Sequence, residues 1–187
     1  MSSRSYTRAL DRVLQPAGFE RQGKDWLRTR DGHLDMVDLQ VSSYAGVTTN
    51  VYTKDLTTEA ILIEALPAGS SPPAFVGGVR IGQFIDGNDR WWRRDPNGPD
   101  EMAAEVEAYF LPFLDRMRPL EEQARWFGRA SDKWGPTQLC LAATLYRMGE
   151  IEEACRSLAK PPRYWIRDRA QEIAALRRWL GCEDGCA

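Results

Sequence analysis

Residues 24–54 read KDWLRTRDGHLDMVDLQVSSYAGVTTNVYTK, and this stretch predicts an antiparallel meander of β-strands. An Asp-Gly pair at residues 31–32 marks the first turn, because Asp-Gly tolerates the positive φ angles of a tight hairpin. After the turn the residues alternate, so Val37 and Asp38 are expected on opposite faces of one strand. Residues 47–53 are rich in Val, Thr and Tyr, which favours a further strand.

Helical periodicity flanks this meander on both sides. Residues 3–17 predict an amphipathic helix that stops at Gly18. Residues 100–117 give the clearest helical pattern of the chain, and Asp100 suits the N-cap of that helix. Pro112 lies inside the pattern and predicts a kink, because proline removes a backbone donor.

The segment between the meander and the second helix is mixed. Residues 56–66 fit either a helix or a strand, and their periodicity does not decide between the two. Residues 67–78 predict a loop because Pro, Gly and Ser are frequent there. Residues 79–85 predict the last strand, which gives a sheet of about four strands.

The C-terminal part of the chain is predicted to be entirely helical. A short helix is expected from Pro119 through Phe127, and residues 129–135 are a candidate boundary. Three helices follow, at residues 136–148, 150–159 and 165–180. The predicted fold class is therefore α+β: a small antiparallel sheet flanked by helices in a domain of residues 1–128, then an all-α extension of residues 129–187.

Length, composition and charge exclude several classes of protein. With 187 residues, 43% of them apolar, the chain can bury a sizeable core without disulfide bonds or bound metal ions. Basic and acidic residues number 8 and 9 in residues 1–70, 7 and 10 in residues 71–127, and 10 and 8 in residues 128–187. No region has the basic excess that phosphate neutralisation needs, so nucleic acid is not an expected partner.

Hydropathy argues against a membrane protein. No apolar run approaches the length of a membrane span, so no membrane partner is expected. The N-terminal residues have no apolar core of the kind that a secretory signal needs. These observations predict a cytoplasmic location.

All four cysteines lie in the last quarter of the chain, at Cys140, Cys155, Cys182 and Cys186. Without an export signal, reduced thiols are expected rather than a disulfide framework. Zinc ligands usually pair as C-x2-C to C-x4-C, and only Cys182 and Cys186 are that close. We predict two buried cysteines and a frayed tail, with no metal and no cofactor.

Candidate catalytic groups are scarce in the sequence. His33 is the only histidine, it lies beside a turn glycine, and no nucleophile motif such as G-x-S-x-G occurs. Asp86, Asp89 and Asp95 lack the spacing of a calcium-binding EF-hand and predict a solvated loop. No catalytic residue is predicted.

A pair of tryptophans followed by two arginines is the most distinctive local feature. Adjacent residues on a strand face opposite sides, so one tryptophan is expected in the core and the other at the surface. An exposed tryptophan flanked by arginines is typical of an interface hot spot, although arginine can also stack on tryptophan within a fold. Arginine at position 80 can bind a carboxylate or phosphate, or pair with an acidic residue of a neighbouring strand. The candidate interaction surface is Trp91, Trp92, Arg93, Arg94 and Arg80.

The first 117 or so residues resemble a bacterial family known as domain of unknown function 4304. Four pieces carry the resemblance: residues 14–19 (LQPAGF), the strands at Trp26 and at 37–40 (VDLQ), residues 80–82 (RIG) with 89–92 (DRWW), and residues 111–114 (LPFL). The resemblance implies an α+β fold and brings no established activity and no catalytic residues. Members of this kind often lie among bacterial toxin–immunity and stress-related genes, so the resemblance implies an immunity role.

Residues 138–161 resemble one tetratricopeptide-type helical hairpin. The matching positions are Ala142, Leu145, Gly149, Glu153, Ala154, Leu158 and Pro161. A single unit cannot bury its own face, so the helix at 165–180 is expected to cap it. A generic helical hairpin explains the same residues equally well.

These observations predict a non-enzymatic protein-binding or interaction module whose partner is another protein. The candidate contact surfaces are the outer face of the sheet, the loop at 67–78 and residues 91–94. One alternative is an immunity protein that neutralises a bacterial toxin by occluding its active site. The other is an unrecognised enzyme with a pocket near Arg80, which Asp38 and Tyr52 would join.

Overall fold

The computed structural model describes residues 3–70, 76–92, 96–131, 135–159 and 169–182. The chain divides into two compact units. The sheet unit comprises Met1–Thr53 and Gly77–Arg116, and the helical unit comprises Lys54–Val76 and Met117–Ala187. This division differs from the predicted boundary at residue 128, because two segments that the prediction gave to the first domain belong to the helical unit.

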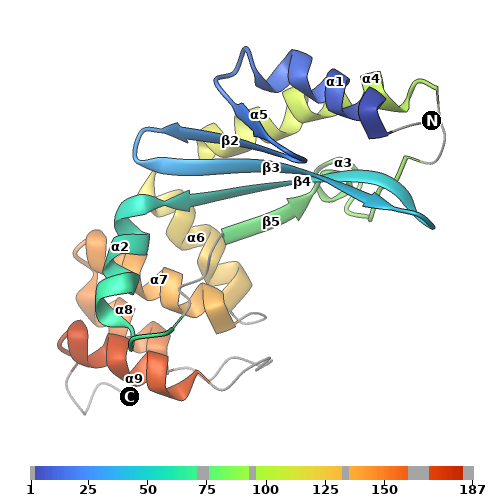
Figure 1. Cartoon of the computed structure of the whole chain (residues 1–187). Coiled ribbons are helices and arrows are strands. Elements are labelled where there is room, and N and C mark those ends of the chain that lie inside the picture. The colour runs from blue at the N-terminus through green and yellow to red at the C-terminus, as the bar shows by residue number, and fades with distance from the viewer. Residues whose placement is uncertain (1–2, 71–75, 93–95, 132–134, 160–168, 183–187) are drawn as a thin grey trace. The chain divides into compact units, whose positions relative to one another are not determined.

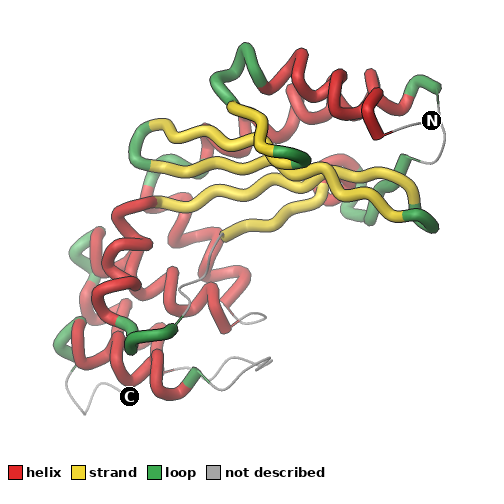
Figure 2. The backbone as a smooth tube through the Cα atoms, viewed as in Figure 1, coloured by secondary structure: helices red, strands yellow, loops and turns green. Residues whose placement is uncertain are grey.

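The sheet has five antiparallel strands in the order β1-β2-β3-β4-β5 (Figure 2). The strands are β1 (Glu20–Gln22), β2 (Asp25–Arg30), β3 (His33–Ser42), β4 (Gly46–Asp55) and β5 (Val76–Arg80). The predicted meander is confirmed, and β1 is an additional strand that the sequence did not indicate. The predicted turn is also confirmed, since Asp31 has φ of 51° and Gly32 has φ of 73°.

One face of the sheet carries the core of the sheet unit. Trp26 of β2 and Val37 of β3 are fully buried on this face, and Asp38 lies on the other face, as the alternation predicted. The buried face is covered by α1 (Ser3–Leu14) and by the helical segment at residues 98–116 (Figure 1). Leu10 and Leu14 of α1 are fully buried, so the amphipathic pattern of the first helix is confirmed.

The long helix after the sheet is interrupted, as its proline predicted. It consists of α4 (Gly98–Glu105), a π-helical turn η1 (Val106–Phe110) and α5 (Leu111–Arg116). The backbone N–H of Leu111 donates to the carbonyl of Val106, five residues back. Pro112 cannot donate to the preceding turn, and a π-turn is one way to absorb that loss. The helix begins two residues before Asp100, the predicted N-cap.

The prediction of a strand over residues 79–85 is confirmed for residues 79 and 80 and is wrong for residues 81–85. Strand β5 ends at Arg80, and Ile81–Ile85 form the short helix α3. The side chain of Gln83 accepts a hydrogen bond from the backbone N–H of Arg80 at 3.3 Å, which favours a helical start. A tight backbone approach at Gly82 fixes the turn that follows.

The helical unit contains α2, α6, α7, α8 and α9. Their bounds are Leu56–Ala65 for α2, Leu120–Ser131 for α6, Gly135–Arg147 for α7, Ile151–Ala159 for α8 and Ala170–Trp179 for α9. The last three confirm the predicted helices at 136–148, 150–159 and 165–180, apart from residues 160–168, which lie outside the described residues. Within the described part of the chain, no helix is long and apolar enough to cross a bilayer.

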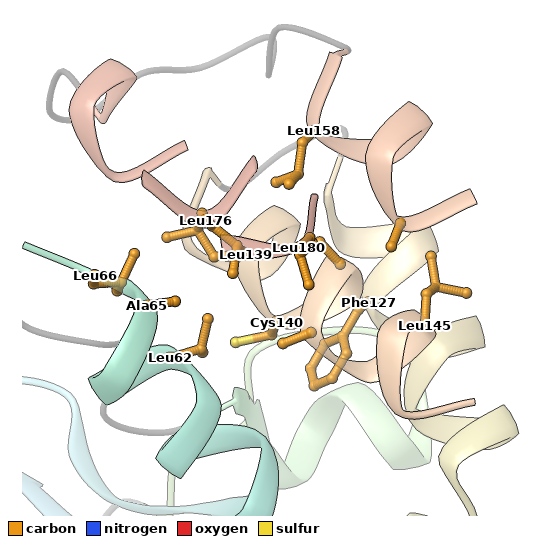
Figure 3. Close-up of a cluster of buried hydrophobic side chains, with 13 residues drawn as sticks. Leu62, Ala65, Leu66, Phe127, Leu139, Cys140, Leu145, Leu158, Leu176 and Leu180 are labelled. Atoms are coloured by element: carbon orange, nitrogen blue, oxygen red, sulfur yellow. The ribbon is translucent and has the colours of Figure 1, made fainter. Parts of the chain in front are cut away.

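Helix α2 resolves the ambiguity of residues 56–66. The carboxylate of Asp55 accepts hydrogen bonds from the backbone N–H groups of Thr57 and Thr58, both at 2.9 Å, and so caps the helix. Leu62 is buried in an apolar core to which α6, α7, α8 and α9 also contribute (Figure 3). Packing against helices distant in sequence therefore explains why this segment belongs to the helical unit.

The prediction of reduced thiols differs from the structure. Cys155 of α8 and Cys182, just after α9, form a disulfide with their Cα atoms 5.5 Å apart. Cys140 is a buried free thiol, and burial raises its pKa to about 12. Cys186 lies outside the described residues. The fold brings together two cysteines that are 27 residues apart, which the spacing alone did not reveal.

Replacing Cys182 by serine is expected to lower the free energy of unfolding by about 3–4 kcal/mol under non-reducing conditions, because the disulfide restricts the unfolded chain. Urea unfolding of the wild type and Cys182→Ser measures the difference. With dithiothreitol, which reduces the bond, the two proteins should unfold at nearly the same urea concentration. Equal stability without reductant would show that the bond does not form in solution.

Candidate functional site

Arg80, at the end of β5, is the centre of a polar cluster on the face of the sheet opposite to the core. Its Nε lies 3.3 Å from Oδ1 of Asn50, and its Nη2 lies 3.1 Å from Oε1 of Gln40. Its Nη1 donates to the carboxylate of Asp89. The guanidinium carbon lies 5.1 Å from the centre of the Trp91 ring. We call these five residues the Arg80 cluster.

Strand order explains how residues so distant in sequence meet. Gln40, Asn50 and Arg80 come from β3, β4 and β5, which are neighbours in the sheet. Asp89 and Trp91 follow α3, where the Asp86 carboxylate accepts the backbone N–H of Asn88 at 3.0 Å and tightens the turn. The side chain of Arg80 is therefore held by two neutral amides, one carboxylate and one aromatic ring.

Asp38 adjoins the Arg80 cluster through Asn50. Its Oδ1 accepts hydrogen bonds from the backbone N–H of Asn50 at 3.2 Å and from Nδ2 of Asn50 at 2.6 Å. Its Oδ2 lies 3.5 Å from the hydroxyl of Tyr52. Asn50 thus bridges a carboxylate and a guanidinium, since its Oδ1 accepts from Arg80.

The ionisation of Asp38 and Tyr52 is perturbed by this environment. Burial raises the pKa of Asp38, the hydrogen bonds from Asn50 oppose that rise, and the negative charge of Asp25 adds to it. Burial and the adjacent Asp38 raise the pKa of Tyr52. The pKa of Asp89 is lowered, chiefly by its hydrogen bond to Arg80. Ionisable groups with perturbed pKa values are more frequent at functional sites than elsewhere.

The two tryptophans differ in burial, since Trp91 is half-buried and Trp92 is buried. Trp92 is only 4% exposed, and its Nε1 donates to a carboxylate oxygen of Glu101 at 3.2 Å. It also pairs with Val47 through backbone hydrogen bonds in both directions. Trp92 is therefore a core residue, and only Trp91 of this pair contributes to a surface. Arg93 and Arg94 lie outside the described residues.

The structure brings together Arg80, Asp38 and Tyr52, the three residues of the enzyme alternative, through Asn50. It also adds Asn50 and Gln40, which the sequence did not single out, and it pairs Asp89, predicted only as part of a solvated loop, with Arg80. The alternation of residues along β3 predicts that Gln40 lies on the outer face of this strand. The roles of Asn50 and Asp89 depend on strand register and on the turn after α3, which no local pattern reports.

Other candidate groups lie elsewhere in the fold. His33 is buried beside the β2–β3 turn, with Nδ1 2.9 Å from the carbonyl oxygen of Asp31. The described residues contain no group of three or more His, Cys, Asp or Glu side chains placed to hold a metal ion. A cavity of about 20 Å³ in the helical unit, lined in part by Lys54, Glu59 and Cys140, has room for about one water molecule.

The fold and the cluster define a class of protein: an α+β domain with a helix-covered antiparallel sheet whose other face carries a polar, arginine-centred cluster. The chain belongs to the family described as Domain of unknown function (DUF4304), which matches residues 10–116, more than half of the sequence. No curated protein and no solved structure matches the chain. The matched residues end before α6, so the tetratricopeptide resemblance of α7 and α8 stays a prediction.

Replacing Asp38 by asparagine is expected to stabilise the protein at pH 7. Folding raises the pKa of Asp38 above its ordinary value of 3.8. Such a group stabilises the folded protein while it is protonated, at pH values below 3.8, and this stabilisation is lost as the pH rises through the pKa of the folded protein. At pH 7 the ionised form is therefore a cost that asparagine removes, while its side-chain oxygen can still accept from Asn50.

Urea unfolding of wild type and Asp38→Asn at several pH values between 3 and 7 tests this prediction. The stability advantage of the variant should shrink as the pH falls. A variant that is less stable than the wild type at pH 7, with a difference independent of pH, would show that the Asp38 pKa is not raised.

Proposed function

We propose that the chain is a non-enzymatic binding protein that recognises another protein through the Arg80 cluster. One observation carries this proposal: the guanidinium of Arg80 is positioned over Trp91 by partners on three other segments, yet the Arg80 side chain is 27% exposed. Arginine and tryptophan are the residues most enriched in interface hot spots.

Preorganisation supports the proposal. Ordering an arginine side chain on binding costs conformational entropy, which weakens an interface. In this fold the contacts to Gln40 and Asn50 order Arg80 before any partner arrives. The Arg80 cluster consists of five residues, four of them polar or charged, which suits one anchor of an interface rather than a complete interface.

The finer form of the proposal is an immunity protein in the bacterial cytoplasm that neutralises a toxin. This form of the proposal commits to one-to-one binding of the toxin. A cytoplasmic setting would keep Cys155 and Cys182 as thiols, although the fold places them close enough to bond when oxidised. Mass spectrometry after alkylation of freshly lysed cells distinguishes the two states.

Affinity capture with matched variants tests the proposal. The wild type, Trp91→Ala and Tyr44→Ala are each used as bait in lysate of the native host, and bound proteins are quantified by mass spectrometry. Tyr44 is 88% exposed in the β3–β4 turn and serves as the control aromatic. We expect a partner retained by wild type and Tyr44→Ala and reduced at least about tenfold by Trp91→Ala, the usual loss at a hot spot.

Circular dichroism and urea unfolding must show that Trp91→Ala folds normally, since Trp91 is only partly buried. A partner captured equally by all three proteins would overturn the proposal. Equal loss in Trp91→Ala and Tyr44→Ala would place the interface elsewhere.

A second candidate function is an enzyme or small-ligand receptor that uses Asp38 and Tyr52. The observation that favours it is the meeting of these two groups, both with raised pKa values, beside the positive charge of Arg80. A crystal soaked with fragments would test it. A ligand bound between Tyr52 and Arg80 would favour this candidate over the protein-binding one.

A further inference from the structure

We propose that Arg80 and Trp91 form a carboxylate-binding subsite, which Asp89 fills in the free protein and an acidic side chain of the partner fills in the complex. This inference rests on the proposed function and names the chemistry by which the partner is recognised.

Two donors from separate segments converge on one carboxylate. Nη1 of Arg80 contacts both carboxylate oxygens of Asp89, and Nε1 of Trp91 donates to Oδ2 at 3.1 Å. Charge-assisted hydrogen bonds of this kind are the strong ones that proteins use to recognise carboxylates. The geometry of the site is thus demonstrated by the carboxylate that already lies in it.

The subsite does not depend on Asp89 for its construction. Nε and Nη2 of Arg80 are held by Asn50 and Gln40, and the guanidinium packs over the Trp91 ring. These partners are neutral, so they orient Arg80 without cancelling its charge. Removal of the Asp89 carboxylate would leave both donors in place. The positive charge of Arg80 would then lose the negative charge that pairs with it.

Asp89 is a replaceable occupant. Its side chain is 57% exposed, and it lies on the solvent-facing turn after α3. Exposed ion pairs contribute little to stability, so exchange of one carboxylate for another costs little. Other contacts with the partner can then decide which carboxylate occupies the subsite.

An acetate titration of Asp89→Ala tests the subsite without any partner. Sodium acetate is added to the ¹⁵N-labelled protein at an ionic strength fixed with sodium chloride, and the indole N–H resonance of Trp91, assigned with Trp91→Phe, is followed. We expect a saturable shift in Asp89→Ala. The wild type should need an acetate concentration about two- to fivefold higher, because Asp89 competes as an exposed ion-pair partner.

Two further proteins serve as controls. Asp115→Ala removes another exposed carboxylate of the sheet unit, with a side chain 56% exposed, and should respond as the wild type does. Adding Arg80→Gln to Asp89→Ala should abolish the saturable shift. A shift that is linear in acetate, or that survives Arg80→Gln, would overturn the subsite.

A second test of the subsite uses the captured partner. Asp89→Ala should bind the captured partner about two- to fivefold more tightly than wild type, since the internal competitor is gone. Acetate binding together with capture that does not depend on Trp91 would reject the proposed function and keep the subsite. Trp91-dependent capture without acetate binding would reject the subsite and keep the function.

Discussion

Replacing Asp35 by asparagine is expected to lower the free energy of unfolding by about 3–5 kcal/mol, because it removes one partner of a buried ion pair. Asp35 is fully buried, and its Oδ2 accepts hydrogen bonds from Nε and Nη2 of Arg28 at 3.0 and 2.9 Å. Thr53 donates to the other oxygen at 2.8 Å. In the variant, Arg28 keeps a positive charge that is only 7% exposed and loses its counter-charge.

Urea unfolding measures this loss, and Asp115→Asn is the matched control. Asp115 pairs with Arg30 at 3.5 Å, both side chains are more than half exposed, and the expected change is below about 1 kcal/mol. The double variant Arg28→Met with Asp35→Leu should recover much of the stability, since it removes both buried charges. Similar losses for Asp35→Asn and Asp115→Asn would show that the buried ion pair contributes no more to the free energy of unfolding than the exposed one.

Replacing Gly82 by alanine is expected to lower the free energy of unfolding by about 3 kcal/mol or more, because the added methyl group meets the backbone of the turn after α3. A Cβ atom at this position would lie 2.3 Å from the carbonyl oxygen of Asn88 and 2.7 Å from the backbone nitrogen of Arg90. Neither atom can move unless the turn after α3 moves with it. That turn carries Asp89, so the variant should also lose the contact between Asp89 and Trp91.

Urea unfolding and the indole resonance of Trp91 report these two effects separately. Gly128→Ala is the control: Gly128 is exposed in α6 with nothing near the added methyl group, and alanine there should raise stability by about 0.5–1 kcal/mol. An unchanged unfolding midpoint for Gly82→Ala would contradict the close backbone approach. The result bears on residues 80–82, where a steric requirement explains the glycine.

Local pattern was sufficient to predict most elements of this fold. Alternation after His33 identified β3 and its two faces, and helical spacing identified α1, α7 and α8. Pro112 predicted a distortion, which the structure shows as the π-turn η1, ending at Phe110 directly before α5. These features depend on interactions between residues close in sequence, which explains why the sequence could reveal them.

The predictions that failed concern features that depend on contacts between distant segments. Residues 56–66 were ambiguous because their helix is selected by packing against α7 and α9. For the same reason the two compact units divide the chain differently from the predicted boundary at residue 128. The strand predicted through residue 85 ended early because Gly82 packs on a turn that begins at Asp86.

The candidate site was only partly predictable. Arg80 and Trp91 were recognised from their chemistry, and Asp38 and Tyr52 were named in an alternative. Asn50, which connects Arg80 to Asp38, resembled an ordinary residue of a strand. Its role requires the register of β3, β4 and β5, and the carboxylate that pairs with Arg80 comes from a following turn rather than from a neighbouring strand.

Hydrogen–deuterium exchange of the protein with and without its captured partner tests most directly whether the Arg80 cluster is the recognition surface. We predict that binding slows exchange in residues 76–92 and in the parts of β3 and β4 around Gln40 and Asn50. Protection confined to α7, α8 and α9, with residues 76–92 unchanged, would contradict the account.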